Sequence, residues 1–258
     1  MNSRLAAITL NTFREAVRDR VLYNLILFAL LLVASAPLFG EISLGLEKLI
    51  IVNVGLSSIS IFGIIIAIFI GIGLVSKEIE KRTLYTILSR PVRRWEFITG
   101  KYLGLLLTLV VNAAFMTFGF FVALLVVTRH LVREDAGFLV AIYFIILQFF
   151  IVTAITLLFS SFSSPIFSAI FAFALFVIGT FSDDLRNFAA IAEGATKWLA
   201  TGAAWVVPNF SSLNVILQAA HGQHIRGQLI LFNTVYSLLY SAAAIALAVI
   251  IFERRNLK

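Results

Sequence analysis

Long apolar stretches alternate with short polar ones along this 258-residue chain. A helix needs roughly 20 mostly apolar residues to cross about 30 Å of hydrocarbon. Six stretches are long enough or nearly so, at residues 21–39, 49–75, 102–127, 138–160, 165–181 and 227–252. The fifth is the shortest, and a further apolar run at 195–207 is too short to add another span. The pattern therefore predicts an all-α integral membrane protein with six transmembrane helices, forming one domain over residues 1–258.

Residues 4–20, before the first span, have the period of an amphipathic helix. Their apolar positions recur at i, i+4, i+7 and i+11, at Ala6, Leu10, Phe13 and Val17. Polar residues on the opposite side include Arg14 and Arg18. Because a helix of this kind lies in the membrane interface, we expect these two Arg side chains to face lipid head groups or a partner protein.

The second and third spans are separated by the longest strongly polar stretch, residues 76–101, which holds seven of the twenty Lys and Arg residues. Within it, apolar residues fall at helical spacing, at Leu84, Tyr85, Ile87 and Leu88. Pro91 disfavours helical geometry at the residue before it and suits the first turn of a following helix. We therefore predict two short helices separated by a turn. A basic loop that only binds anionic lipid would not need the apolar patch, which favours a protein partner.

Two short features bear on how the spans pack. Gly100 and Gly104 form a small-xxx-small pair at the start of the third span, and such a pair permits the close approach of another helix. The sequence SFSS at 161–164, followed by Pro165, predicts a tight turn between the fourth and fifth spans.

The connection between the last two spans, residues 182–226, is not polar enough to be disordered. Ser182 is a candidate cap for a first short helix, and NFSSLNVILQ, after Pro208, is a candidate for a second. Trp198 and Trp205 suit the aromatic belt at a membrane surface. We expect two short helices that lie on the outer leaflet or dip into it.

Composition supports the membrane assignment. The chain is 61% hydrophobic and 13% charged, whereas soluble domains are about 45–50% apolar and about 25% charged. Cysteine is absent, which excludes disulfides and thiolate metal sites.

The distribution of the net charge of +7 indicates how the chain is oriented in the membrane and does not indicate nucleic-acid binding. With the N-terminus in the cytosol, the cytosolic segments carry a total charge of +8 and the external segments a total of −1. Positive charge gathers on the cytosolic side of membrane proteins, so this orientation is the expected one. It places both termini in the cytosol and requires an even number of spans.

The spans contain almost no reactive chemistry. None holds an Asp, Glu, Lys, Arg or His, which argues against a proton- or sodium-coupled carrier working alone. The chain has no HExxH, GxSxG or GxxxxGK[ST] sequence, so it lacks the motifs of a membrane protease, a hydrolase or a P-loop ATPase. His221 and His224 have no carboxylate beside them, and we expect no metal site. Neutral polar side chains in the spans, such as Gln148, are better explained by interhelical hydrogen bonds than by a substrate site.

Motifs along the chain resemble those of the type-2 ATP-binding-cassette (ABC) exporter permeases. NTFREAVRDR at 11–20 is similar to the connecting or elbow helix of that family. KEIEKRTLYTILSRPVRRWEFITGKYLG at 77–104 is similar to its coupling-helix loop, with the family pattern at Glu78, Lys81, Arg82, Thr83, Leu88, Ser89, Pro91, Val92, Phe97, Gly100 and Lys101. SSFSS at 160–164 and PNFSSLN at 208–214 resemble the NosY-like branch, named for multicopper-enzyme maturation.

The resemblance implies two permease subunits, either two copies or this chain and a paralogue, and two copies of an ABC ATPase. A cytosolic coupling helix would dock on the ATPase through Glu78, Glu80, Arg82, Thr83, Leu84, Ile87, Leu88 and Arg90. Arg14 and Arg18 would lie at the elbow-helix interface. No cofactor would be bound directly, because ATP and Mg²⁺ belong to the ATPase. The implied location is the inner (cytoplasmic) membrane, with lipid and a periplasmic accessory protein as further partners and no nucleic acid.

The branch name points to copper, but the composition does not. The chain has no Cys, two Met and three His, and all three His lie outside the predicted spans. A direct metal-carrying role is not expected, and the cargo stays open among lipid, peptide and a sulfur species for a periplasmic protein.

Three functions fit these observations. The first is the permease subunit of an ATP-driven exporter. The second is a membrane anchor that transmits ATPase-driven motion to a periplasmic or surface assembly without moving a solute. The third is a stand-alone channel or scaffold, which would need no ATPase.

Overall fold

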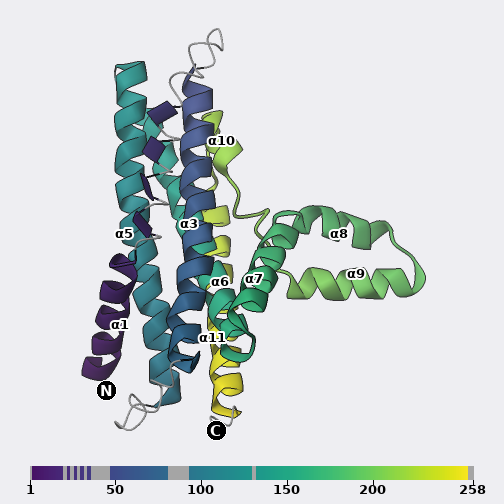
Figure 1. The fold of residues 1–258 in the computed structure, drawn as a ribbon. Helices are drawn as coiled ribbons and strands as arrows, with labels where there is room; N and C mark the ends of the chain where they lie inside the picture. The colour runs from purple at the N-terminus through teal and green to yellow at the C-terminus, as the bar shows by residue number, and fades with distance from the viewer. Residues whose placement is uncertain are drawn as a thin grey trace.

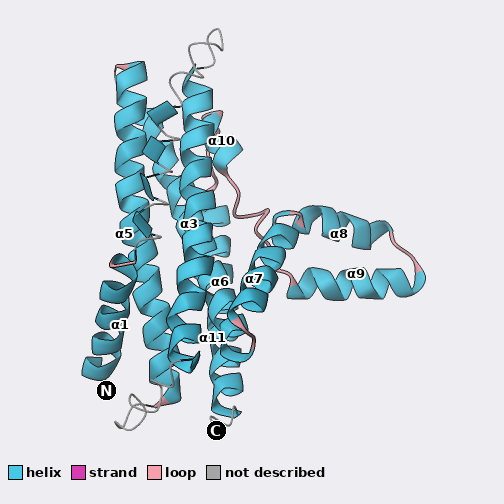
Figure 2. Cartoon of the chain, viewed as in Figure 1, coloured by secondary structure: helices cyan, strands magenta, loops and turns pink. Residues whose placement is uncertain are grey.

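The computed structural model describes residues 2–19, 47–80, 93–129 and 132–254, with four short pieces between residues 22 and 35. Within these residues every regular element is a helix (Figure 2). The helices are α1 (Asn2–Val17), α3 (Glu47–Glu80), α5 (Arg94–Thr128), η1 (Arg133–Ala136, 3₁₀), α6 (Gly137–Phe162), α7 (Pro165–Thr180), α8 (Ser182–Ile191), α9 (Gly194–Val206), α10 (Ile216–Ala220) and α11 (Gly227–Arg254). The predicted all-α class is confirmed.

Four of these helices, α3, α5, α6 and α11, are long and apolar enough to cross a membrane. A fifth candidate is the pair α7 and α8, which meet at a bend of 64°. The predicted spans at 49–75, 102–127, 138–160, 165–181 and 227–252 therefore each have a helix. The first predicted span, 21–39, lies mostly outside the described residues.

The four long helices stand side by side, and α1 lies against one end of α5 (Figure 1). Both described chain ends lie at that same end of the bundle, which we call the basal end. Helix α6 is the most enclosed, with 72% of its most apolar window buried. Large apolar side chains of α6, including Phe144 and Phe149, are almost completely buried in the core. Because α6 is enclosed in this way, nearly all of its side chains face apolar surroundings, and the stretch 138–160 is accordingly a continuous apolar sequence.

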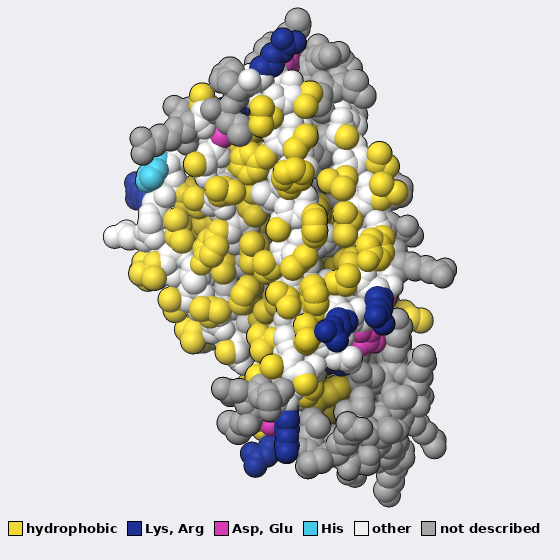
Figure 3. All heavy atoms as spheres, turned by 90° about the vertical axis from the view of Figure 1, so that its left-hand side faces the viewer, with side chains coloured by type: hydrophobic (Ala, Val, Ile, Leu, Met, Phe, Trp, Pro, Cys, Tyr) yellow, Lys and Arg dark blue, Asp and Glu magenta, His cyan; other side chains and the backbone are white. Residues whose placement is uncertain are grey.

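The outer surface of the bundle has the distribution that a bilayer requires. Figure 3 shows apolar side chains forming a broad band across the face that includes α5, with Lys and Arg toward the two ends of the molecule. Large apolar side chains of α5 are exposed, for example Phe115 at 64% and Phe118 at 72%. Soluble proteins rarely show apolar patches of this extent, whereas in membrane proteins such patches face the lipid.

Two loops between spans differ in how well the sequence predicted them. The turn at 161–164 is as expected, since α6 ends at Phe162 and α7 begins with Pro165 in its first turn. In the stretch 76–101, α3 continues to Glu80 and α5 begins at Arg94, so the polar stretch extends two membrane helices at its ends. The helix predicted after Pro91 is continuous with the third span, and Pro91 lies outside the described residues.

The prediction for residues 182–226 was wrong in detail. Two helices, α8 and α9, precede Pro208, and after it only the five residues of α10 are helical. The NFSSLN segment forms turns instead of a helix, because its polar side chains bond to nearby backbone and to other elements. Ser182 is the first residue of α8 rather than its cap, and its hydroxyl donates to Asn209.

Candidate functional site

The predicted coupling residues fall mainly on residues whose placement the structure does not describe. Glu78 and Glu80 lie in the last turn of α3. The other predicted coupling residues lie outside the described residues: Arg82, Thr83, Leu84, Ile87, Leu88 and Arg90. What the structure does describe is the framework that holds this segment at both ends, formed by the end of α3 and the start of α5.

The start of α5 is attached to the end of α11. Arg94 donates from Nη1 to the carbonyl oxygens of Phe252 and Glu253, at 2.7 and 2.9 Å. These carbonyls belong to the last turn of α11, where the helix itself supplies no donors. The Phe97 ring also stacks on the Phe252 ring, with centroids 5.9 Å apart. A cationic side chain and an aromatic pair thus join two helices that are far apart in sequence.

The first turn of α5 carries a buried carboxylate. The Glu96 side chain is 2% exposed and its Oε2 accepts a hydrogen bond from the Arg93 backbone N–H at 2.9 Å. A carboxylate at this position satisfies an N-terminal donor and interacts favourably with the helix dipole. This bond explains why the helix begins at Arg94.

Helix α1 packs closely on the same part of α5. A Cβ atom added at Gly100 would lie 2.5 Å from Cγ2 of Ile8, and one at Gly104 would lie 2.5 Å from Cβ of Thr12 and 2.7 Å from the backbone oxygen of Thr9. The close packing expected of the small-xxx-small pair is therefore present. Its partner is the N-terminal helix.

The face of α1 that packs on α5 is not the predicted apolar stripe. Thr12 and Ala16 are completely buried, whereas Leu10 of the predicted stripe is 45% exposed. Ile8, Thr9 and Thr12 are the α1 residues that meet the α5 glycines, and the absence of side chains at Gly100 and Gly104 allows this close approach. Arg14 and Arg18 are exposed, as the predicted polar side requires.

An ion pair joins α1 to α5 within this interface. Nζ of Lys101 lies 3.2 Å from Oε2 of Glu15, and the side chains are 3% and 44% exposed. The Lys101 ammonium also lies 5.7 Å from the centroid of the Phe97 ring. The sequence analysis gave Lys101 a place in the family pattern but did not pair it with Glu15. No periodic pattern connects two residues 86 positions apart.

A second group of polar contacts holds the segment after Pro208 against the spans. Asn209 accepts hydrogen bonds on Oδ1 from the Ser182 hydroxyl at 2.7 Å and from the Ser212 N–H at 3.1 Å. Its own backbone N–H donates to the Tyr236 hydroxyl at 2.8 Å. Asn209 thus connects α8 and the following turn through its side chain, and α11 through its backbone N–H.

We expect Asn209→Ala to lower the stability of the folded protein by about 1–2 kcal/mol, because it leaves buried donors without an acceptor. Asn187→Ala on the exposed surface of α8 is the matched control and should have almost no effect. Thermal unfolding of the two purified variants in detergent measures the difference, and equal unfolding temperatures would contradict the role given to Asn209.

Gln148, which the sequence singled out as a neutral polar residue inside a span, is structural. It accepts a hydrogen bond from the Ser60 hydroxyl at 3.0 Å and donates to the Leu213 carbonyl at 3.1 Å. It therefore joins α3, α6 and the turn that follows Pro208. The prediction of interhelical hydrogen bonding is confirmed for this residue.

The described residues contain no group of three His, Asp or Glu side chains arranged to hold a metal ion. Both candidate histidines are exposed, and Nδ1 of His221 lies 2.8 Å from the Leu217 carbonyl oxygen.

Comparison with known proteins identifies the family. A family model described as ABC-2 family transporter protein matches residues 6–257. A comparison with curated proteins found no match. The family match does not separate branches, so the NosY-like assignment stays a prediction. Because the match covers nearly the whole chain, the protein belongs to the ABC-2 transporter family and is a multi-pass membrane component of an ABC transporter.

Proposed function

We propose that this chain is the permease of an ATP-driven exporter in the inner membrane, moved by a separate ATPase that binds the segment 78–90. The permease works as a pair, with a second copy or a paralogue, and each permease binds one ATPase subunit. ATP and Mg²⁺ are bound by the ATPase. The proposal includes a single permease domain with six spans, both termini in the cytosol, α1 as the elbow helix, and a periplasmic accessory protein as a further partner.

The observation that carries this proposal is the connection of α5 to two other helices where the basic segment joins it. Its first turns bond to the end of α11 through Arg94 and contact α1 through Gly100, Gly104 and Lys101. A force applied to segment 78–90 would enter α3 and α5 directly. Since the start of α5 is held by α1 and α11, these helices would move together rather than α5 bending alone.

The predicted spans lack charged side chains, which is consistent with a permease that receives its energy from a separate ATPase. Ion-coupled carriers use ionisable groups inside the membrane to gain energy from a gradient. The six predicted spans contain none of these groups. An external source of energy, delivered through a basic segment that joins two spans, accounts for this composition.

The test is a set of variants in the proposed coupling helix. We expect Glu78→Ala, Arg82→Ala and Leu84→Asp each to lower ATP-driven transport about tenfold, because a loss of about 1.4 kcal/mol in a binding contact is a tenfold change in affinity. The amount of permease in the membrane should not change. The measurements are the ATPase-to-permease ratio after purification and the ATP turnover of the reconstituted complex.

Arg226→Ala is a charge-removal control, because Arg226 precedes α11 at its far end from the basal end. Coupling variants that keep the native ATPase ratio and full transport-linked turnover would show that these positions are assigned incorrectly. A complete complex whose ATP turnover moves nothing across or between leaflets would instead favour the membrane-anchor function.

A further inference from the structure

The hairpin formed by α8 and α9 projects sideways from the middle of the bundle (Figure 1). Its base is attached there by the Tyr240 hydroxyl, which donates to the Val206 carbonyl at 2.9 Å, and by the Asn209 N–H, which donates to Tyr236 at 2.8 Å. Both tyrosines lie near the middle of the 28-residue helix α11. The hairpin is therefore attached to the middle of α11 rather than to its end.

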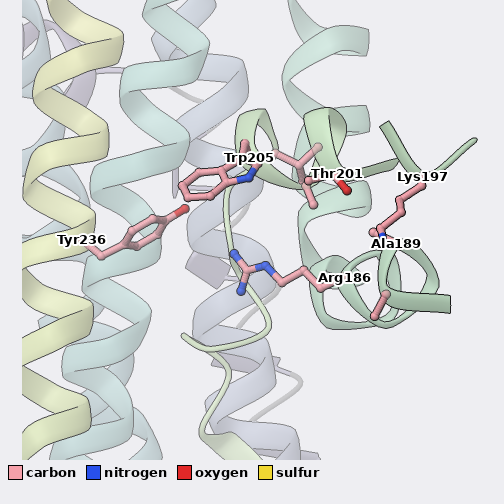
Figure 4. A pocket seen from close by; sticks show the side chains of 9 residues that line it. Arg186, Ala189, Lys197, Thr201, Trp205 and Tyr236 are labelled. Carbon is pink, nitrogen blue, oxygen red and sulfur yellow. The ribbon is translucent and has the colours of Figure 1, made fainter. Parts of the chain in front are cut away.

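A pocket of about 530 Å³ lies between this hairpin and α11. Its lining combines two cations, Arg186 and Lys197, with two aromatic rings, Trp205 and Tyr236, and the hydroxyl of Thr201. The remaining lining is Ala and Val, and none of the described lining residues is acidic. Figure 4 shows the Arg186 guanidinium extending toward the space that Trp205 and Tyr236 also face, with Lys197 on the far side.

The cations of this pocket are at most weakly paired with acidic side chains among the described residues. Asp183 is 3.8 Å from Arg186, and both side chains are about half exposed, at 58% and 45%. An ion pair with this separation and exposure contributes less than about 1 kcal/mol to stability. The other Asp183 oxygen already accepts a hydrogen bond from Ser211 at 2.6 Å. Lys197 has no acidic partner within salt-bridge distance among the residues that the structure describes.

The pocket also presents hydrogen-bond donors. The Tyr236 oxygen accepts from Asn209, so its own O–H remains available to donate. The guanidinium of Arg186 offers several N–H donors in one plane, a geometry that matches phosphate and carboxylate oxygens. The aromatic rings and alanines beside these donors provide an apolar surface. Donors, cations and an apolar wall together fit an anion that carries a hydrocarbon chain.

The position of the pocket beside α11 strengthens this argument. A cation beside a membrane-spanning helix is costly to place in lipid unless it faces a cavity or an anion. Long side chains can instead extend to the membrane surface, but Arg186 extends toward α11 (Figure 4). We propose that this pocket binds the anionic head of an amphiphile, a phosphate or carboxylate on an apolar chain. That the bound amphiphile is the cargo rests on the proposed function, whereas the binding itself does not.

The test uses the purified permease without ATPase or ATP, so that it is independent of coupling. Trp95→Phe and Trp198→Phe leave Trp205 as the only tryptophan of the three in the chain. Dodecyl phosphate added to this protein in a neutral maltoside detergent should change the Trp205 fluorescence and saturate. Arg186→Gln with Lys197→Gln should weaken this binding about tenfold or more, since charge-assisted hydrogen bonds are lost.

Further controls test the role of the pocket charges, the role of the hydrocarbon tail and the source of the ligand. Arg226→Gln removes an exposed cation outside the pocket and should leave the titration unchanged. Lys197→Gln alone gives a second variant with little risk of misfolding, because Lys197 is exposed and has no hydrogen-bond or ion-pair partner to lose among the described residues. Inorganic phosphate should bind more weakly than dodecyl phosphate. In nanodiscs, stronger quenching by brominated phosphatidylglycerol than by brominated phosphatidylcholine would identify the bilayer as the source of the ligand.

Three results would overturn the proposal. The first is an unchanged dodecyl phosphate titration in the Arg186→Gln, Lys197→Gln variant. The second is an equal response to dodecanol, which has the chain but no charge. The third concerns a second copy of the permease: because the chain has no native Cys, Thr201→Cys provides a unique thiol. A disulfide between two such copies would show that protein, rather than an amphiphile, fills the pocket.

Discussion

Replacing Gly104 with leucine is expected to destroy the packing of α1 on α5 and leave little stably folded protein. A Cβ atom at this position would lie 2.7 Å from the Thr9 backbone oxygen, and a backbone atom cannot turn away as a side chain can. Overpacking by even small groups costs about 1–3 kcal/mol, so Gly104→Ala should fall in that range and Gly104→Leu should exceed it. The measurement is the temperature at which half of the purified protein loses its monodisperse state in detergent.

Gly137→Ala and Gly202→Ala are the matched controls. A Cβ at either position would meet no atom within 4 Å, so only helix propensity should change. That change favours Ala by up to about 1 kcal/mol in a helix interior. Stability of Gly104→Leu equal to that of these controls would mean that α1 does not pack on α5 at this glycine.

Separating the Lys101–Glu15 pair should have the second largest effect, a loss of about 2 kcal/mol for Glu15→Gln. Removing one partner leaves the other charge in a site where Lys101 is only 3% exposed. The expected loss is smaller than for a completely buried pair, because Glu15 is 44% exposed and partly hydrated. The variant with both Glu15→Gln and Lys101→Met should recover much of the stability, because it also removes the buried ammonium of Lys101.

A double-mutant cycle measures this coupling directly. The control is the pair of Lys48 and Asp135, 2.6 Å apart, in which the Asp side chain is 3% exposed. It lies away from the basal end, at the start of α3 and in η1. Lys48→Met with Asp135→Asn should change stability but not ATP-driven transport. Additive effects of the Glu15 and Lys101 substitutions would contradict the proposed pair.

Several elements were predictable from local pattern alone. The apolar run at 138–160 corresponds to α6 at Gly137–Phe162, because the length of a membrane helix follows from the thickness that it crosses. The turn before Pro165 was also predicted, since proline suits the first turn of a helix. The family was identified from the same kind of information, through the spacing of motif residues.

Other elements were not predictable, and α1 shows why. Its periodicity identified an amphipathic helix but not the face that packs on α5, because apolar residues are found both where a helix faces lipid and where it faces protein. Thr12, a polar residue, is completely buried because it faces Gly104. The turns at 209–214 were read as a helix for a related reason: the partners of Asn209, in α8 and α11, lie more than twenty residues away.

The sequence by itself determined what each segment is: which stretches are apolar enough to span, which segment is basic, and to which family the motifs belong. These properties depend on residues that are neighbours in the chain. The tertiary structure decided which segments meet: Gly100 and Gly104 with α1, Lys101 with Glu15, and the cations of the α8–α9 hairpin with α11. In an apolar solvent every span is equally soluble, so the choice of partner depends on shape and on a few polar contacts that only the folded chain brings together.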